Sequence, residues 1–282
     1  MKIRMFSAGI GILLLLVIVF ANKIVLGIFV FIVAVIAITE FYNALKKAGY
    51  NPVYPIGYIG CIPVLFIALN GTLEFIDEYV MIFKSLNYFS IFIFGLFFLL
   101  MCFSVFLHKK YSLNDIALTL FGIIYIAFLM TFLILVRSKP DHGFYLMWFV
   151  FIGAWGTDTF AYFTGRLLGK HKIVPQISPN KTIEGSIGGF IGCIGLTAAY
   201  GMVMNSYGFL TGMSIVDYLI IGISCGILSQ FGDWMASSLK RYLKIKDFGN
   251  IMPGHGGALD RFDSILFIAP FVYFYASFVL SI

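Results

Sequence analysis

Long, nearly uninterrupted runs of apolar residues constrain this chain more than any other feature. About 20 apolar residues cross the hydrocarbon core of a bilayer as a helix, which satisfies its backbone hydrogen bonds internally. Hydrophobic residues make up 61% of the 282 and charged residues only 11%, so a water-soluble fold could not bury the apolar surface. We predict an all-α, polytopic membrane helix bundle of about nine transmembrane helices. The runs that predict them cover residues 6–21, 24–42, 54–70, 87–107, 115–136, 144–165, 185–205, 213–233 and 264–282.

The Lys and Arg residues between these runs are unevenly distributed. If the runs alternate across the membrane, 15 of the 19 basic residues lie on the side of the N-terminus and four on the opposite side. Because basic residues concentrate in cytoplasmic loops, we predict a cytoplasmic N-terminus and an external C-terminus. Topology thereby accounts for the net charge of +6, and we expect no nucleic-acid partner. The expected location is a bacterial plasma membrane, which the chain crosses several times.

Polar residues divide the chain into two functional regions. Residues 1–142 contain hydrophobic runs with short loops and are predicted to be N-terminal membrane scaffold helices. Residues 143–282 carry two patterned polar stretches, 155–185 and 232–263, and are predicted to form the catalytic membrane region. Both stretches fall on the predicted cytoplasmic side, so any active site is expected to face the cytoplasm.

Cysteine and glycine residues within the apolar runs favour packing roles. The four cysteines lie in apolar runs without a CxxC pair, which favours buried, inert thiols over a disulfide framework or a zinc site. Pairs of glycines four residues apart predict close helix packing, with a substrate path as the alternative. These pairs are Gly185 and Gly189, Gly188 and Gly192, and Gly222 and Gly226.

Four aspartates stand inside or at the ends of apolar runs, where a charge is costly and usually functional. They are Asp158, Asp233, Asp260 and Asp263. The last two are three residues apart, which places them on one face if that segment is helical. On the predicted topology all four lie near the cytoplasmic ends of their helices, and hard cations such as Mg²⁺ take oxygen ligands of this kind. The alternative is that each acid is an interfacial partner of a nearby Lys or Arg.

The two polar stretches also carry groups suited to phosphate. The first stretch has hydroxyls and a lysine at Ser178, Lys181 and Thr182, and glycines elsewhere that leave backbone N–H groups available. It does not match a Walker A loop. The second stretch has a cluster of basic residues and then a Gly-His-Gly-Gly turn, residues 254–257. Its lysines have an alternative role as positive-inside or anionic-lipid contacts, and His255 has one as a structural histidine. Together the residues predict a metal-dependent membrane enzyme acting on phosphates.

Residues 237–263 closely resemble the phosphatidate cytidylyltransferases, or CDP-diacylglycerol synthases. The resemblance rests on the segments 237–241 (SSLKR), 246–249 (KDFG) and 253–263 (PGHGGALDRFD), whose spacings all match the family pattern. Residues 155–185 look like the second strongly patterned region of that family. Ala258 and Met252 depart from the usual aliphatic residues, and both changes concern packing.

The resemblance implies transfer of the cytidylyl group of CTP to phosphatidate, giving CDP-diacylglycerol and pyrophosphate, with Mg²⁺ as cofactor. It leaves open whether a second cation joins Mg²⁺. The implied metal ligands are Asp158, Asp233, Asp260 and Asp263. The implied catalytic residues are Lys240, Arg241, Lys246, His255 and Arg261. The implied substrate-binding residues are Ser178, Lys181, Thr182, Gly256 and Gly257.

Other functions remain as alternatives at this point. CDP-archaeol synthases and CTP-dependent polyprenol kinases belong to the same wider family, and headgroup motifs do not encode the lipid tail. A transporter could also bury acids, although it would be expected to place them near the bilayer midplane and often in repeated halves. The expected partners are CTP, phosphatidate and the lipid bilayer, and a homodimer is one option for the assembly.

Overall fold

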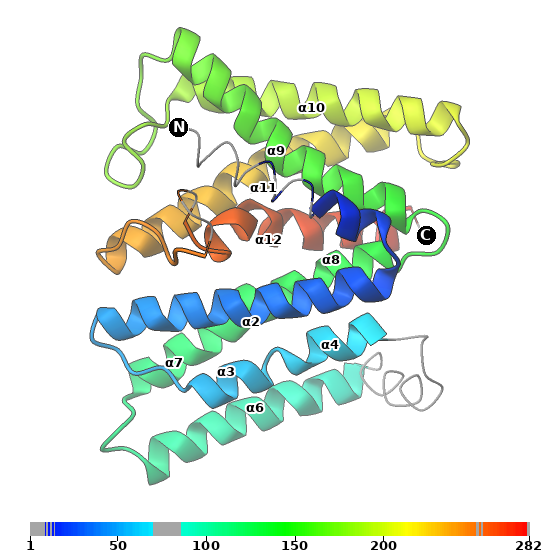
Figure 1. Ribbon diagram of the computed structural model, residues 1–282. Helices are drawn as coiled ribbons and strands as arrows, with labels where there is room; N and C mark the ends of the chain where they lie inside the picture. Colours follow the sequence, from blue (N-terminus) through cyan, green and yellow to red (C-terminus); the bar gives the residue numbers. More distant parts are fainter. Residues whose placement is uncertain are drawn as a thin grey trace. The chain divides into compact units, whose positions relative to one another are not determined.

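The structure, a computed structural model, describes residues 9, 11, 13, 15–69, 86–251, 254 and 256–280, and for 86–90 the backbone alone. Over these residues the chain forms helices and no β-strand, which confirms the all-α prediction (Figure 1). The chain divides into two compact units. Unit 1 comprises Met1–Ile134 and Leu243–Arg261, and unit 2 comprises Leu135–Tyr242 and Phe262–Ile282. The division into a scaffold, 1–142, and a catalytic region, 143–282, concerns roles and stays a prediction.

Five helices are long and apolar enough to cross a membrane, so the prediction of a membrane helix bundle is confirmed in this coarser form. They cover Lys23–Lys47, Leu113–Arg137, Ile183–Ser206, Ile215–Tyr242 and Leu259–Val279. The apolar helices over Tyr54–Leu69 and Ile91–Phe106 are shorter. Helix α9 (Gly143–Leu168) has the length to span but not the apolarity, because polar residues such as Asp158 and Arg166 interrupt it. Nine transmembrane helices are therefore more than the described residues support.

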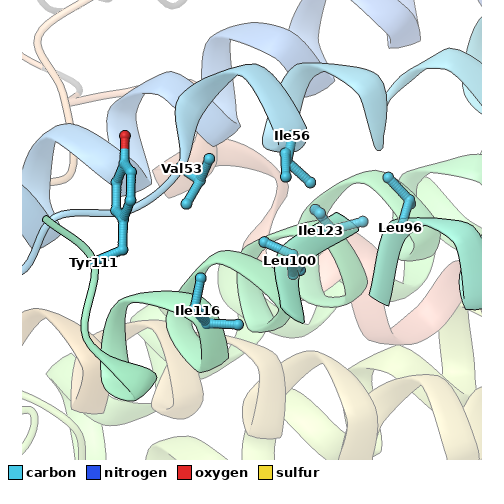
Figure 2. Packing of buried hydrophobic residues seen from close by; sticks show 7 residues of the cluster. All are labelled: Val53, Ile56, Leu96, Leu100, Tyr111, Ile116 and Ile123. Atoms are coloured by element: carbon cyan, nitrogen blue, oxygen red, sulfur yellow. The ribbon is translucent and has the colours of Figure 1, made fainter. Parts of the chain in front are cut away.

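Unit 1 is built around helix α2 (Lys23–Lys47). Against it lie the short helices α3 (Tyr54–Ile59) and α4 (Ile62–Leu69), and a long helix made of α7 (Leu113–Gly122), η1 (Ile123–Phe128) and the start of α8 (Leu129–Arg137). Helix α6 (Leu86–Phe106) packs on α3 and α7. Figure 2 shows the apolar cluster that joins α3, α6, α7 and η1, and it contains Val53, Ile56, Leu96, Leu100, Tyr111, Ile116 and Ile123.

Tyr42 fixes the packing of α2 within unit 1. Its ring is fully buried, and its hydroxyl donates a hydrogen bond to the carbonyl oxygen of Thr119 at 2.8 Å. A Cβ atom at Gly57 or Gly122 would overlap the Tyr42 ring, so both neighbouring helices need glycine at these positions. A buried hydroxyl with its partner in place avoids the cost of an unsatisfied polar group. This packing fixes how α2 lies against its neighbours within unit 1, and α2 carries a buried carboxylate described below.

Unit 2 contains α9, α10 (Ile183–Ser206) and α11 (Ile215–Tyr242), which pack on one another, and most of α12 (Leu259–Phe274) with η2 (Tyr275–Val279). Glycines line the contact of α10 with α9, where a Cβ at Gly188 or Gly192 would overlap Thr164 or Phe160. Gly222 of α11 likewise lies against the backbone of α10. The prediction of close helix packing at the spaced glycines is therefore confirmed.

Substitution of Gly189 tests this packing. A Cβ there would lie 2.7 Å from the carbonyl oxygen of Thr157 and 2.9 Å from the Cβ of Ala161. Because backbone atoms cannot move aside cheaply, we expect Gly189→Ala to destabilise the protein by about 1–3 kcal/mol. The matched control is Gly195→Ala on the same helix, where nothing lies within 4 Å of the added atom. Thermal unfolding in detergent should separate the two variants, and equal melting temperatures would contradict the close approach of α9 and α10.

The described cysteines fit their predicted role. Cys61, Cys193 and Cys225 are buried, Cys102 is partly buried, and all four are free thiols. Small apolar thiols suit helix contacts, as at Gly153, where an added Cβ would lie 2.8 Å from the Cβ of Cys225.

Candidate active site

Lys181 and Asp233 form the centre of the candidate site in unit 2. The Lys181 ammonium makes an ion pair with the Asp233 carboxylate, and the two side chains are only 27% and 26% exposed. Asp158 of α9 and Asp263 of α12 act electrostatically on the same ammonium, as does Lys240 of α11. The Lys181 ammonium nitrogen lies over the ring of Trp234, 6.0 Å from the centroid of that ring. Three helices and a loop thus bring three of the four predicted aspartates around one cation.

The loop between α9 and α10 presents Lys181. Residues on its two sides pair as an isolated antiparallel bridge, Lys172 with Thr182, and the Ile173 N–H donates to the carbonyl oxygen of Lys181 at 3.2 Å. Thr182 then caps α10, because its hydroxyl accepts a hydrogen bond from the Gly185 N–H at 3.1 Å. Thr182 is buried, so its place in the structure is a helix cap directly beside Lys181.

Asp233 lies on α11 and is oriented by a close approach of α12. A Cβ at Gly232 would lie 2.6 Å from the carbonyl oxygen of Asp263, so the two backbones meet here. The Ser264 hydroxyl donates to the carbonyl oxygen of Ser229 at 3.0 Å and joins the same two helices. Ser237, one turn beyond Asp233, donates to its other carboxylate oxygen at 3.3 Å. The carboxylate of Asp233 is therefore held from both sides.

Electrostatics make Lys181 an unusual lysine. Burial lowers the pKa of its ammonium to about 8, although the carboxylates of Asp158 and Asp263 act to raise it. The positive charge of Lys240 lowers the pKa further. Desolvated cations surrounded by carboxylates are typical of functional sites, because burial without function is costly.

The end of α11 joins the same loop. Arg241 donates through Nε to the carbonyl oxygen of Ile177 at 3.1 Å, and the Ser178 N–H donates to the Val174 carbonyl oxygen at 2.8 Å. Ser178 is partly buried and Arg241 is exposed. The apolar run predicted α11 to end at 233, whereas the helix continues to Tyr242, because polar residues end an apolar run without ending a helix. Asp233, Ser237, Lys240 and Arg241 therefore share one rigid element.

The second group of predicted residues belongs to unit 1 and surrounds Asp260. This aspartate is 7% exposed, and its Oδ2 accepts hydrogen bonds from the N–H groups of Phe248 at 2.9 Å and Gly257 at 3.0 Å. Gly256 adopts a φ of 85°, which glycine alone adopts without strain, and a Cβ there would lie 3.0 Å from the same Oδ2. The Gly256–Gly257 pair thus has a backbone role in folding the loop around Asp260.

For the remaining predicted residues, where the structure describes them, it gives exposure and position in the fold, without a specific side-chain contact in either group. Lys246 and Arg261 are exposed, and Asp260 and Asp263 both lie on α12, so the prediction that this segment is helical is confirmed. His255 lies outside the described residues. The electrostatic group around Lys181 and the hydrogen-bonded loop around Asp260 fall in different units.

Glu40 of α2 is a polar residue of the site region that the sequence analysis missed. Its carboxylate is 9% exposed and accepts hydrogen bonds from the N–H groups of Ala258 and Leu259, each at 3.0 Å. The signal was present in the sequence, since Glu40 is the one acid within the apolar run 24–42. Applying the cost of a charge in hydrocarbon to every run would have singled it out.

The acids differ from a closed metal site. Among the described residues, no three His, Cys, Asp or Glu side chains lie close enough to hold a metal ion by themselves. Mg²⁺ commonly uses only one or two carboxylates and takes its other ligands from water and substrate phosphates. The carboxylates of Asp158, Asp233 and Asp263 around Lys181 are oxygen donors of the right kind. These side chains have the oxygen chemistry that a divalent cation takes, without forming a complete ligand set among the described residues.

Comparison with known proteins identifies the family of the chain. The chain is 30% identical over 275 residues to the phosphatidate cytidylyltransferase of Bacillus subtilis (strain 168), covering 97% of each chain. It is 33% identical over 270 residues to that of Staphylococcus epidermidis and 34% identical over 272 residues to that of Staphylococcus saprophyticus, covering 96% of each chain in both cases. The model of the cytidylyltransferase family matches residues 2–279 of this chain. This chain therefore belongs to the cytidylyltransferase family.

Proposed function

We propose that this protein transfers the cytidylyl group of CTP to phosphatidate, forming CDP-diacylglycerol and releasing pyrophosphate. The observation that carries the proposal is the ion pair of Lys181 with Asp233, since these residues are 52 positions apart and belong to the two different patterned stretches. Full-length similarity to proteins named phosphatidate cytidylyltransferase supports the same reaction. The membrane-spanning helices suit a substrate that stays in the bilayer while CTP arrives from water.

The reaction asks for charge neutralisation more than for a base. An oxygen of the phosphatidate phosphate forms a bond to the α-phosphorus of CTP, and the bond from that phosphorus to the bridging oxygen breaks as pyrophosphate leaves. The nucleophile is already an anion at neutral pH, so no proton has to be removed. The enzyme has to bring two anions together and stabilise charge on the leaving oxygens, which Lys and Arg side chains do well.

The proposed roles follow the chemistry of each side chain. Lys181, Lys240, Arg241, Lys246 and Arg261 contact phosphate oxygens, while Ser178 and His255 donate hydrogen bonds. Thr182, Gly256 and Gly257 shape the loops that bind substrate. Asp158, Asp233, Asp260 and Asp263 are the proposed oxygen ligands of Mg²⁺, which when bound would neutralise phosphate charge. In unit 2 these acids also hold Lys181 in place.

The topology completes the proposal. We place the N-terminus in the cytoplasm, the C-terminus outside and the active site at the cytoplasmic face of a bacterial plasma membrane. The basis is the excess of Lys and Arg in alternate loops. Cysteine-accessibility labelling of single-cysteine variants at Lys47, the last residue of α2, and Asp141, in the turn before α9, would test this orientation, because the two positions are predicted to lie on opposite sides of the membrane.

A labelling experiment tests the reaction. Purified protein in detergent micelles is given phosphatidate, Mg²⁺ and CTP labelled on either its α- or its γ-phosphate. We expect the α-label to appear in the lipid and the γ-label in pyrophosphate, in equal amounts, and EDTA to abolish both. Appearance of the γ-label in the lipid would instead indicate a CTP-dependent lipid kinase. The absence of any turnover by a folded sample would refute the proposed enzyme activity.

A further inference from the structure

Glu40 is a buried carboxylate that the proposed reaction does not use directly. It lies in α2, a helix whose neighbouring residues Ile38 and Phe41 are both fully buried. A charge in such surroundings requires partners, because its desolvation costs several kcal/mol if it is left alone. Here both carboxylate oxygens have one: Oε1 accepts from the Ala258 N–H and Oε2 from the Leu259 N–H.

The two N–H groups are those at the start of helix α12. The first N–H groups of a helix have no partner within the helix, and a side chain just before it usually accepts from one of them. Ala258 precedes α12 and its methyl group cannot do so. Glu40, 218 residues away in the chain, acts as the cap instead, and its negative charge also suits the positive end of the helix dipole.

The surrounding loop is shaped to admit this carboxylate. A Cβ atom at either Gly249 or Gly257 would overlap Glu40, so both positions require glycine for a steric reason. The Phe41 ring contacts the Phe248 ring next to them, with centroids 6.1 Å apart. Consecutive residues of α2 therefore contact both ends of the segment between Phe248 and α12.

We infer that Glu40 is a positioning residue, which holds the start of α12 and the loop before it so that Asp260 and Arg261 are presented for the reaction. Two buried carboxylates hold the described ends of this loop, since Asp260 accepts from the Phe248 and Gly257 N–H groups and Glu40 from the next two along the chain. This inference rests on the proposed function for the roles of Asp260 and Arg261. The contacts of Glu40 itself do not depend on that function.

The experiment measures loop order and catalysis separately. Hydrogen–deuterium exchange of the peptide covering residues 246–260 is compared between the full-length wild type and Glu40→Ala, without substrate or metal. We expect faster exchange in this peptide and little change in α6 or α10. In the activity assay, Glu40→Ala should lower kcat and raise the half-saturating Mg²⁺ concentration, each by about 10- to 100-fold, as loss of an outer supporting group does. Glu40→Gln keeps one acceptor oxygen, so its exchange rate, kcat and half-saturating Mg²⁺ concentration should lie between those of the wild type and Glu40→Ala.

Two further variants separate positioning from a general loss of stability. Thr39→Val removes a polar group from the adjacent residue of α2, whose hydroxyl contacts Val35 and Tyr58, and should leave exchange and rate unchanged. Gly249→Ala should be harmful in the wild type, and the Glu40→Ala background should relieve this effect because the overlapping carboxylate is gone.

The outcomes are distinct. Unchanged exchange at 246–260 in Glu40→Ala would overturn the inference, and so would faster exchange spread evenly over all helices of unit 1. An unchanged rate and Mg²⁺ dependence in a variant with a loosened loop would also overturn it. A wild type that makes no CDP-diacylglycerol would refute the proposed function alone, since the exchange experiment needs no turnover.

Discussion

Replacing Asp233 by Asn is expected to lower CDP-diacylglycerol synthesis by about 100- to 1,000-fold, the loss seen when one preorganised electrostatic group is removed from an active site. Asn is close in size, so the packing of α11 on α12 beside Gly232 should persist. The amide cannot neutralise the partly buried Lys181 ammonium, and it is a poor ligand for Mg²⁺. Rates at saturating CTP and phosphatidate, with melting temperatures for each protein, would measure the effect.

The control for this prediction is Asp141→Asn. Asp141 is exposed and lies in the turn just before the first residue of α9. Its φ is 53°, a conformation that Asn also tolerates. The same chemical change there should leave the rate unchanged. Because Asp233 and Lys181 act as a pair, Lys181→Gln combined with Asp233→Asn should be little worse than the worse single variant. Full additivity of the two losses would contradict a joint role, and wild-type activity in Asp233→Asn would exclude Asp233 from the site.

Replacing Asp260 by Asn should abolish most activity while leaving the protein folded. The amide oxygen of Asn can still accept the hydrogen bonds that Phe248 and Gly257 donate, so the loop before α12 keeps its structure. What is lost is the negative charge, and with it the proposed Mg²⁺ ligand. We expect a loss of rate of about 100-fold or more, with a melting temperature close to that of the wild type.

Asp260→Ala provides the comparison. It removes the acceptor as well as the charge and leaves two buried N–H groups without their partner, which should cost about 1–3 kcal/mol of stability in addition to activity. Thermal unfolding of the two variants separates these effects. If Asn retained full activity and only Ala lost it, Asp260 would be a structural residue of the loop and not a metal ligand.

Local sequence properties were sufficient to identify most of the described long helices. An apolar run of about 20 residues predicts a membrane helix whatever surrounds it, because lipid leaves the backbone no other partner. That argument located α2, α10 and α11. It began the last run at residue 264, after Asp260 and Asp263, and only their spacing of three residues indicated that they share one face if the segment is helical. It failed at the end of α11, where the helix runs on past Asp233 to Tyr242, since hydropathy reports burial in lipid and not helix length.

The candidate site was predictable residue by residue but not in its pairings. A charge in an apolar run, glycine-rich turns and clustered cations single out individual side chains, and the spacing of residues 237–263 indicated the family. Which acid meets which cation is a different question. Lys181 could have paired with any of several aspartates, and the packing of α9, α10 and α11 on their glycines selects Asp233 as its ion-pair partner.

The sequence by itself determined that this protein is a helical membrane protein of the cytidylyltransferase family, because hydropathy, charge and motif spacing are properties of short segments. Only the tertiary structure decided that Asp233 binds Lys181, and that Glu40 caps α12 across 218 residues. Both contacts depend on how helices distant in the chain approach one another. How closely two helices approach depends on the volumes of all the side chains that meet at their glycine positions. A local pattern of hydropathy does not contain that information.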